Sequence, residues 1–128
     1  MVIREGRKQG VDGIVVTHAM GHPVDMNVAQ MREAASLGAK IEFAAGFLIG
    51  GRASFTVNQY YAAIRAVGAD HIILSSDGGQ IGRAPPDELI AMVAGQLLAK
   101  GITRAELRRM MVENPATLLG LQPAASRP

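Results

Sequence analysis

IILSSDGG, at residues 72–79, joins three large apolar residues to an acidic side chain followed by two glycines. The stretch IVVTH at residues 14–18 has a similar form, because an apolar β-branched run ends on a histidine. Short runs of this kind are typical of buried strands. In parallel sheets, ligands and substrates bind beyond the carboxyl ends of the strands. We therefore expect His18 and Asp77 to lie together at one edge of a parallel sheet.

Short apolar runs alternate with longer amphipathic stretches along the rest of the chain, which is the pattern of helices that cover a parallel sheet. The pattern predicts strands at residues 13–17, 39–43 and 71–75, each followed by a helical stretch. The helix after the third strand is expected at about residues 87–99, and two shorter helical segments follow it. The sequence thus predicts an α/β fold with three parallel βα units and C-terminal helices.

Capping residues mark the expected ends of these helices. Thr56 with Gln59, and Thr103 with Glu106, have the spacing of a capping box. Asp25 is the expected cap of the first helix after a strand. The buried side of that helix is predicted to consist of Val28, Met31, Ala34, Ala35 and Leu37.

The two ends of the chain complete the predicted organisation. Residues 2–9 have the character of the last turns of a helix. Asn114 is interpreted as a helix cap, followed by Pro115 at the first helical position. We expect residues 1–122 to form a single domain and residues 123–128 to form a flexible tail.

The composition excludes several classes of protein. A chain of 128 residues that is 48% hydrophobic can bury one core, but not two. A net charge of +2 with two Tyr and three Phe lacks the basic and aromatic surface of nucleic-acid binding. The absence of Cys excludes disulfides and thiolate ligands and fits a reducing compartment. With no apolar run of membrane-spanning length, we expect a cytoplasmic protein that contacts neither nucleic acid nor membrane.

Three motifs occur in a fixed order, VVTHA at residues 15–19, ILSSDGG at 73–79 and ENPATLLGL at 113–121. In this order they resemble the C-terminal part of a metal-dependent hydrolase of the amidohydrolase superfamily, and the resemblance covers most of the chain. In that family a histidine ends the sixth strand, an aspartate ends the eighth strand, and an Asn-Pro-Ala helix follows. The resemblance implies a partial (β/α)8 barrel in which the three βα units match strands six to eight.

The resemblance also implies the roles of two residues. His18 matches the strand-six histidine, which binds the metal or contacts the substrate and the bound water. Asp77 matches the strand-eight aspartate, which contacts the metal and takes a proton from the nucleophilic water. A divalent ion lowers the pKa of bound water to about 7, and a carboxylate nearby can then accept its proton. The implied activity is hydrolysis of an amide, ester or related bond in a small-molecule substrate, with zinc as the expected ion.

The remaining ligands of that family do not occur in this sequence. It contains no His-x-His motif, and no fourth-strand lysine or carboxylate and no fifth-strand histidine accompany His18 and Asp77. Catalytic zinc sites usually combine three protein ligands with one open position. We therefore expect the chain alone to be inactive, and to be completed by a missing N-terminal half or by another copy of itself.

Two further residues are candidates for the rim of this site or for contact with the substrate. His22 follows His18 in the same loop, where a solvated histidine is the alternative interpretation. Glu42 faces away from its apolar neighbours on the second strand. A carboxylate buried there needs a metal or a partner, for which Lys40 and Arg52 are the candidates.

Other residues are given structural interpretations. His71 begins the third strand, so it is expected at the opposite face of the sheet, where side chains serve stability. The glycines at 46, 50 and 51 are separated by bulky residues and lack the following Gly-Lys-Ser/Thr of a phosphate-binding loop. We expect a mobile loop over the mouth of the site in that region.

Two other functions are compatible with the sequence. A non-catalytic half-barrel could self-associate through its open sheet edges, because a second copy would cover the exposed strands. A small doubly wound domain could bind a ligand at the point where its strand order reverses. The order of the strands distinguishes the two folds, since a barrel must be sequential.

Overall fold

The computed structural model describes residues 2–50 and 53–121. Its first elements are α1 (Val2–Lys8), β1 (Val15–Val16), α2 (Val28–Ser36), β2 (Lys40–Ala44) and the short 3-10 helix η1 (Ala45–Phe47). They are followed by α3 (Val57–Val67), the 3-10 helix η2 (Ala69–His71), β3 (Ile72–Ser75) and α4 (Pro86–Ala99). The last elements are α5 (Arg104–Arg108), the π-helical turn η3 (Arg109–Glu113) and α6 (Asn114–Leu118). Within the described residues, no helix has the length and apolar character needed to cross a membrane.

The three strands form one parallel sheet in the order β1-β2-β3. The predicted α/β class with a three-stranded parallel sheet is therefore confirmed. Because the order is sequential, the sheet of the described residues lacks the reversal that a doubly wound domain needs. β1 is shorter than the predicted strand at 13–17, since it pairs only with β2 and its outer edge has no neighbouring strand within the described residues.

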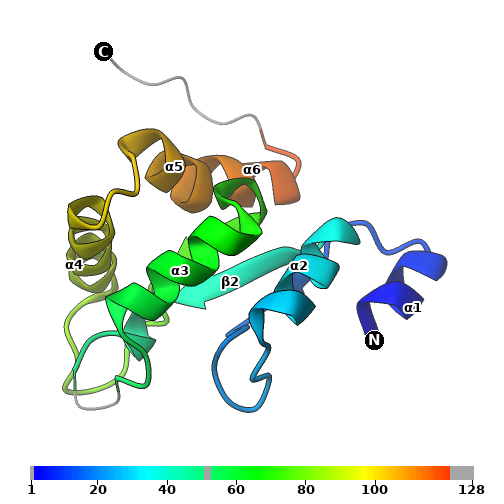
Figure 1. The fold of residues 1–128 in the computed structure, drawn as a ribbon. Coiled ribbons are helices and arrows are strands. Elements are labelled where there is room, and N and C mark those ends of the chain that lie inside the picture. Colours follow the sequence, from blue (N-terminus) through cyan, green and yellow to red (C-terminus); the bar gives the residue numbers. More distant parts are fainter. Residues whose placement is uncertain (1, 51–52, 122–128) are drawn as a thin grey trace.

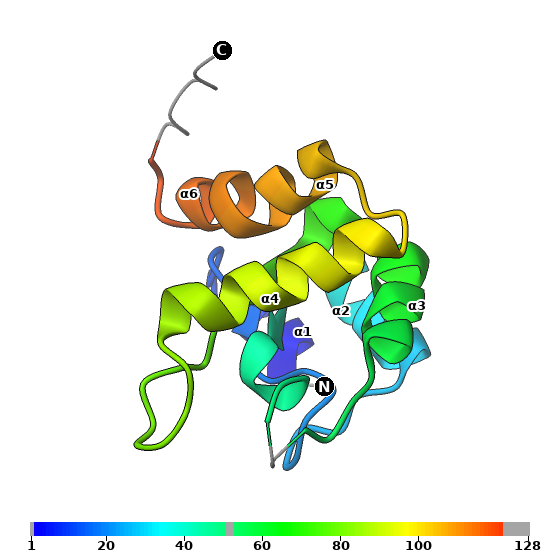
Figure 2. The same ribbon diagram turned by 90° about the vertical axis from the view of Figure 1, so that its left-hand side faces the viewer.

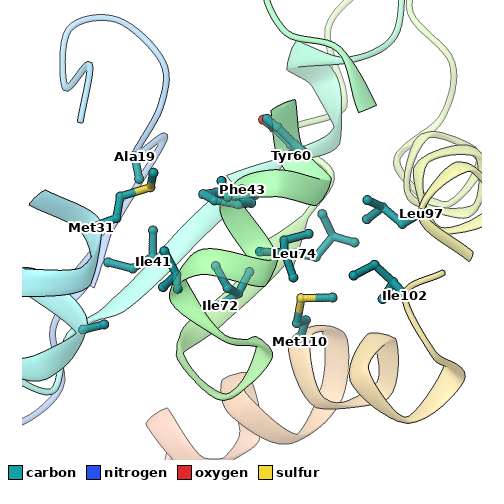
Figure 3. Close-up of a cluster of buried hydrophobic side chains, with 14 of the residues drawn as sticks. Ala19, Met31, Ile41, Phe43, Tyr60, Ile72, Leu74, Leu97, Ile102 and Met110 are labelled. Atoms are coloured by element: carbon teal, nitrogen blue, oxygen red, sulfur yellow. The ribbon is translucent and has the colours of Figure 1, made fainter. Parts of the chain in front are cut away.

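Helices pack against one face of this sheet. α2 and α3 lie next to each other in front of β2, with α1 beyond α2 and α4 on the opposite side (Figure 1). After a quarter turn, α4 lies in front, and α5 to α6 run above it as one line of helix (Figure 2). The ring of Phe43 packs against that of Tyr60, with centroids 4.9 Å apart, and Leu74 lies toward Leu97 and Met110 (Figure 3). All five side chains are buried. This packing buries Ile41, Phe43, Ile72 and Leu74, and on the other face it leaves Lys40, Glu42, Ile73 and Ser75 half-buried.

The helix starts show where local sequence signals were sufficient. The capping boxes of α3 and α5 form as predicted. α2 is different, because its cap is Asn27 and not Asp25. The Asn27 side chain accepts a hydrogen bond from the Gln30 N–H at 3.0 Å, and the Gln30 side chain accepts one from the Asn27 N–H at 2.9 Å. The reciprocal partner at Gln30 favours Asn27, and Val28 consequently lies exposed at the helix start, whereas Met31 is buried as predicted.

Asn114 corrects a second prediction, because it does not cap the last helix. Its own backbone is helical, and α5, η3 and α6 follow one another directly. Pro115 has no N–H to donate, and the wider π-helical turn just before it accommodates the missing backbone hydrogen bond. The Asn114 side chain is 4% exposed and donates from Nδ2 to the carbonyl oxygens of Ala69 at 2.8 Å and Ile72 at 2.6 Å. These hydrogen bonds connect the last helix to the start of β3.

Candidate functional site

The carboxyl ends of β1 and β3 bring His18 and Asp77 together, as expected. The Nε2 atom of His18 lies 3.7 Å from Oδ1 of Asp77, and each side chain is 34% exposed. Because β2 lies between β1 and β3 in the sheet, the two side chains meet across its end. The pair is thus partly shielded, yet open to solvent on one side.

Both residues have a left-handed backbone, with φ of 53° at His18 and 47° at Asp77. Few residues other than glycine adopt this conformation, although it is less unfavourable for His and Asp than for most. Backbone strain of this kind persists only where the surrounding structure holds it, and it is concentrated at functional sites. The occurrence of this conformation at two strand ends that meet supports a functional role for the pair.

Phe47 positions the His18 ring. The two rings meet edge to face with their centroids 5.2 Å apart. On its other side Phe47 covers Gly21, where an added Cβ would lie 2.9 Å from the phenyl ring. The start of the stretch in which we expect a mobile loop forms η1, which places Phe47 against the site. Gly51 lies outside the described residues, and the mobility of the loop stays a prediction. Sequence reasoning missed Phe47, for which the available signal was an aromatic residue directly after a strand in a glycine-rich stretch.

Tyr60 holds the end of β2 from the core side. Its hydroxyl donates to the carbonyl oxygen of Ala44 at 2.9 Å. Burial raises the pKa of the Tyr60 phenol far above its ordinary value, and the negative charges of Glu42 and Asp77 raise it further. Tyr60 therefore stays a neutral donor and fixes the strand that lies between His18 and Asp77.

Glu42 has an unsatisfied oxygen on the other face of the sheet. Its Oε2 is buried and has no hydrogen-bond partner among the described residues, and the same is true of the Ser75 hydroxyl. The register pairs Glu42 with Ile73 and Ala44 with Ser75, so both polar groups lie on one face, on the strands that lead to the site. A buried carboxylate without a partner is unfavourable. Glu42 is therefore suited to a ligand or to a polar group of another strand.

Lys40, the predicted partner of Glu42 that the structure describes, does not pair with it. Lys40 donates to the Asp70 carbonyl oxygen at 2.6 Å and contacts the Asn114 side chain at 3.5 Å, at the amino end of the sheet. Burial lowers the pKa of Lys40, although the neighbouring Asp70 charge opposes this effect. Arg52, the other predicted partner, lies outside the described residues.

The remaining two histidines are not paired with Asp77. His22 is 88% exposed, and its Nδ1 lies 3.1 Å from Oδ2 of Asp25 within a surface loop. His71 ends η2 just before β3, at the amino end of that strand, as expected for a residue on the stability face. Of the three histidines, His18 alone is brought to the carboxyl edge beside Asp77.

The donor set of the pair fits zinc. Zinc accepts imidazole nitrogen and carboxylate oxygen at about 2.0–2.2 Å, which puts two ligand atoms of a tetrahedral ion about 3.4 Å apart. The observed separation of 3.7 Å between the His18 nitrogen and the Asp77 oxygen requires only a small adjustment. Within residues 2–50 and 53–121, no group of three His, Asp or Glu side chains is arranged to hold an ion. The described part of the chain thus offers two ligands.

Comparisons with protein-family models, with curated proteins and with solved structures found no match to this chain. The functional assignment therefore depends on the geometry and chemistry of the site itself.

Proposed function

We propose that this chain is the C-terminal part of a metal-dependent hydrolase with a (β/α)8 barrel, acting on an amide, ester or related bond of a small molecule. The observation that carries the proposal is the 3.7 Å approach of His18 and Asp77 at the carboxyl ends of parallel strands. Active sites of (β/α)8 barrels lie at that end of the sheet. The sequential strand order is compatible with an arc of such a barrel.

The chemistry of the two side chains matches hydrolysis. His18 as a neutral imidazole and Asp77 as a carboxylate would hold a zinc ion. When bound, the ion would supply a water molecule of lowered pKa. Asp77 can orient a water molecule through its free oxygen and accept its proton at that atom. Glu42, with its unsatisfied Oε2, can accept a hydrogen bond from a donor on the substrate.

The ligand count implies that the site is completed by other strands. Two protein ligands are fewer than the three of a typical catalytic zinc site. Within the described residues, the sheet has an open edge at β1 and another at β3, and a closed barrel has no such edges. We therefore propose that strands beyond these three supply the missing ligands, and that the isolated chain binds metal without turning over substrate efficiently.

Calorimetric titration with zinc tests the proposal. We expect one zinc ion to bind saturably at His18 and Asp77, because this pair is partly shielded, whereas the exposed pair of His22 and Asp25 should bind zinc more weakly. A His71→Ala variant is the matched control, since His71 lies at the other end of the sheet and should leave the affinity unchanged. Absence of saturable binding, or its loss in His71→Ala, would contradict the proposed site.

A second candidate function is self-association as a half-barrel, and the open edge of β1 favours it. An apolar groove of about 600 Å³ runs along this edge, between α1 and the loop before α2. The apolar side chains that line it are Val2, Ile3, Val11, Ile14, Val15, Val16, Val24 and Met26. Unpaired strand edges beside apolar surface readily accept another strand. In a two-fold pair, β1 of one copy would pair with β3 of the other, so that all strands stay parallel.

Light scattering at micromolar concentration tests this second function. We expect twice the mass of one chain if the groove accepts a second copy. A Val15→Lys variant places a charge at the edge of β1 and should restore the monomer. Val112→Lys is the control, because Val112 is 39% exposed on η3 and does not line the groove. A wild-type monomer, or a dimer that persists in Val15→Lys, would exclude this mode of association.

A further inference from the structure

Arg83 lies against the edge of the sheet that carries Asp77. It belongs to the loop between β3 and α4, which Asp77 enters from β3. Its Nη1 atom is 2.8 Å from the position that a Cβ would occupy on Gly46, and the carbonyl oxygens of Ser76 and Asp77 lie 3.3 and 3.2 Å from the same point. The Gly46 N–H also donates to the Ser76 carbonyl oxygen at 2.9 Å. The missing side chain at Gly46 thus lets the guanidinium reach the carboxyl ends of β2 and β3.

The charge of Arg83 is not matched within the described part of the chain. The side chain is partly buried, yet no carboxylate of the described residues lies within ion-pair distance of it. Arg65 and Arg109, by contrast, each pair with a glutamate. Removing a guanidinium from water is unfavourable unless an anion compensates. Arg83 is therefore placed to receive a negative charge that a ligand brings.

We propose that Arg83 binds a carboxylate group of the substrate beside His18 and Asp77, an inference that rests on the proposed hydrolase function. The charges of the site agree with this. A divalent ion, when bound, would be held by the Asp77 carboxylate and by His18 as a neutral ring, and the positive charge of Arg83 would remain for an anionic group of the substrate. The substrate is then an amide or ester that carries a carboxylate close to the bond that is hydrolysed.

A carboxylate suits this position better than a phosphate. The planar fork of one guanidinium matches the two oxygens of a carboxylate. Phosphate sites usually gather several backbone N–H groups, often from a glycine-rich loop. The Gly46 N–H is already bonded to the Ser76 carbonyl oxygen and is not free to contribute. Arg83 is the single cation placed here among the described residues, and its planar fork favours the smaller, planar anion.

Binding of two matched probes tests the inference without any turnover. N-acetylglycine carries a carboxylate, whereas N-acetylglycinamide is its neutral analogue of nearly the same shape. We expect the full chain, titrated by NMR, to prefer N-acetylglycine by about tenfold to 100-fold, the range of a hydrogen bond to a charged group. Arg83→Gln should abolish this preference. Arg83→Lys should retain part of it, because lysine keeps the charge but lacks the fork.

One control variant and the zinc titration separate the possible outcomes. Arg104→Gln, on the exposed start of α5, should keep the full preference. If zinc binding fails while the preference persists, the proposed hydrolase is wrong and the carboxylate site stands. Equal affinity for the two probes in the wild-type chain, an unchanged preference in Arg83→Gln, or tighter binding of inorganic phosphate would overturn the inference.

Discussion

Asp77→Asn is expected to lower the zinc affinity of the chain by about 100-fold, or roughly 2.8 kcal/mol. The substitution replaces a charged oxygen ligand by a neutral amide of the same shape. Because the Asp77 oxygen lies 3.7 Å from the His18 nitrogen, its loss leaves a single imidazole at the site. Asn tolerates a left-handed backbone as well as Asp does, so the φ of 47° at this position adds no new strain.

Calorimetry of the variant and of a matched control measures this effect. Asp12→Asn removes the same charge from a side chain that is almost fully exposed and lies outside the site. We expect it to bind zinc as the wild-type chain does, which separates a ligand effect from a change in net charge. A wild-type affinity in Asp77→Asn would show that the carboxylate does not bind the ion.

Asn114→Ala is expected to lower the free energy of unfolding by about 2–4 kcal/mol. The substitution removes the Asn114 donor from the Ile72 and Ala69 carbonyl oxygens, of which Ala69 keeps the Ile72 N–H, and it opens a small cavity between the last helix and β3. A buried polar group without its partner costs more than the net value of the hydrogen bond itself. Urea unfolding should show a lower midpoint with an unchanged slope, as for a loss of stability alone.

Two comparison variants test whether the lost hydrogen bonds of Asn114 cause the destabilisation. Asn114→Asp keeps the volume and the contact with Lys40 but exchanges the donor for an acceptor, so it should also be less stable than the wild-type chain. Asn58→Ala changes an exposed asparagine on α3 and should alter the free energy of unfolding by less than about 0.5 kcal/mol. Equal stability of Asn114→Ala and the wild-type chain would mean that these hydrogen bonds do not anchor β3.

Predictions from the sequence succeeded where the deciding contacts are local. The capping boxes of α3 and α5 each involve two residues three positions apart, so the spacing alone specifies them. The meeting of His18 and Asp77 was also predictable, because parallel strands place their carboxyl ends at one edge whatever the details of packing. Their roles in binding metal remain predictions.

Other features depend on contacts that are distant in sequence. The dipeptide Asn114-Pro115 has the local form of a helix start. The Asn114 side chain, however, donates to the carbonyl groups of Ala69 and Ile72, which lie 45 and 42 residues earlier in the chain. The choice between Asp25 and Asn27 as a cap was local, by contrast, because only Asn27 has a reciprocal partner three positions later, at Gln30. Asp25 and Asn114 are both residue types that favour helix caps, but the contacts made by Asn27 and by Asn114 itself placed the cap elsewhere.

Arg83 shows what the sequence could not reveal. Nothing near it in the sequence distinguishes it from an exposed loop arginine. Its importance follows from Gly46, which lies on another strand end and allows the guanidinium to approach. A close approach between two loops becomes visible only when the fold is known. The same is true of the apolar groove beside β1, whose lining comes from α1, β1, α2 and the adjoining loops.

NMR of the imidazole signals during a zinc titration tests the central claim most directly, because the chain has only three histidines and each can be followed separately. The pair of His18 and Asp77 competes in this experiment with the exposed pair of His22 and Asp25, which has the same chemistry in a surface loop. We predict that the His18 signals shift at the lowest zinc concentration and that Asp77→Asn abolishes this shift. Signals of His22 that respond first, or a His18 response that persists in Asp77→Asn, would contradict a metal site shared by His18 and Asp77.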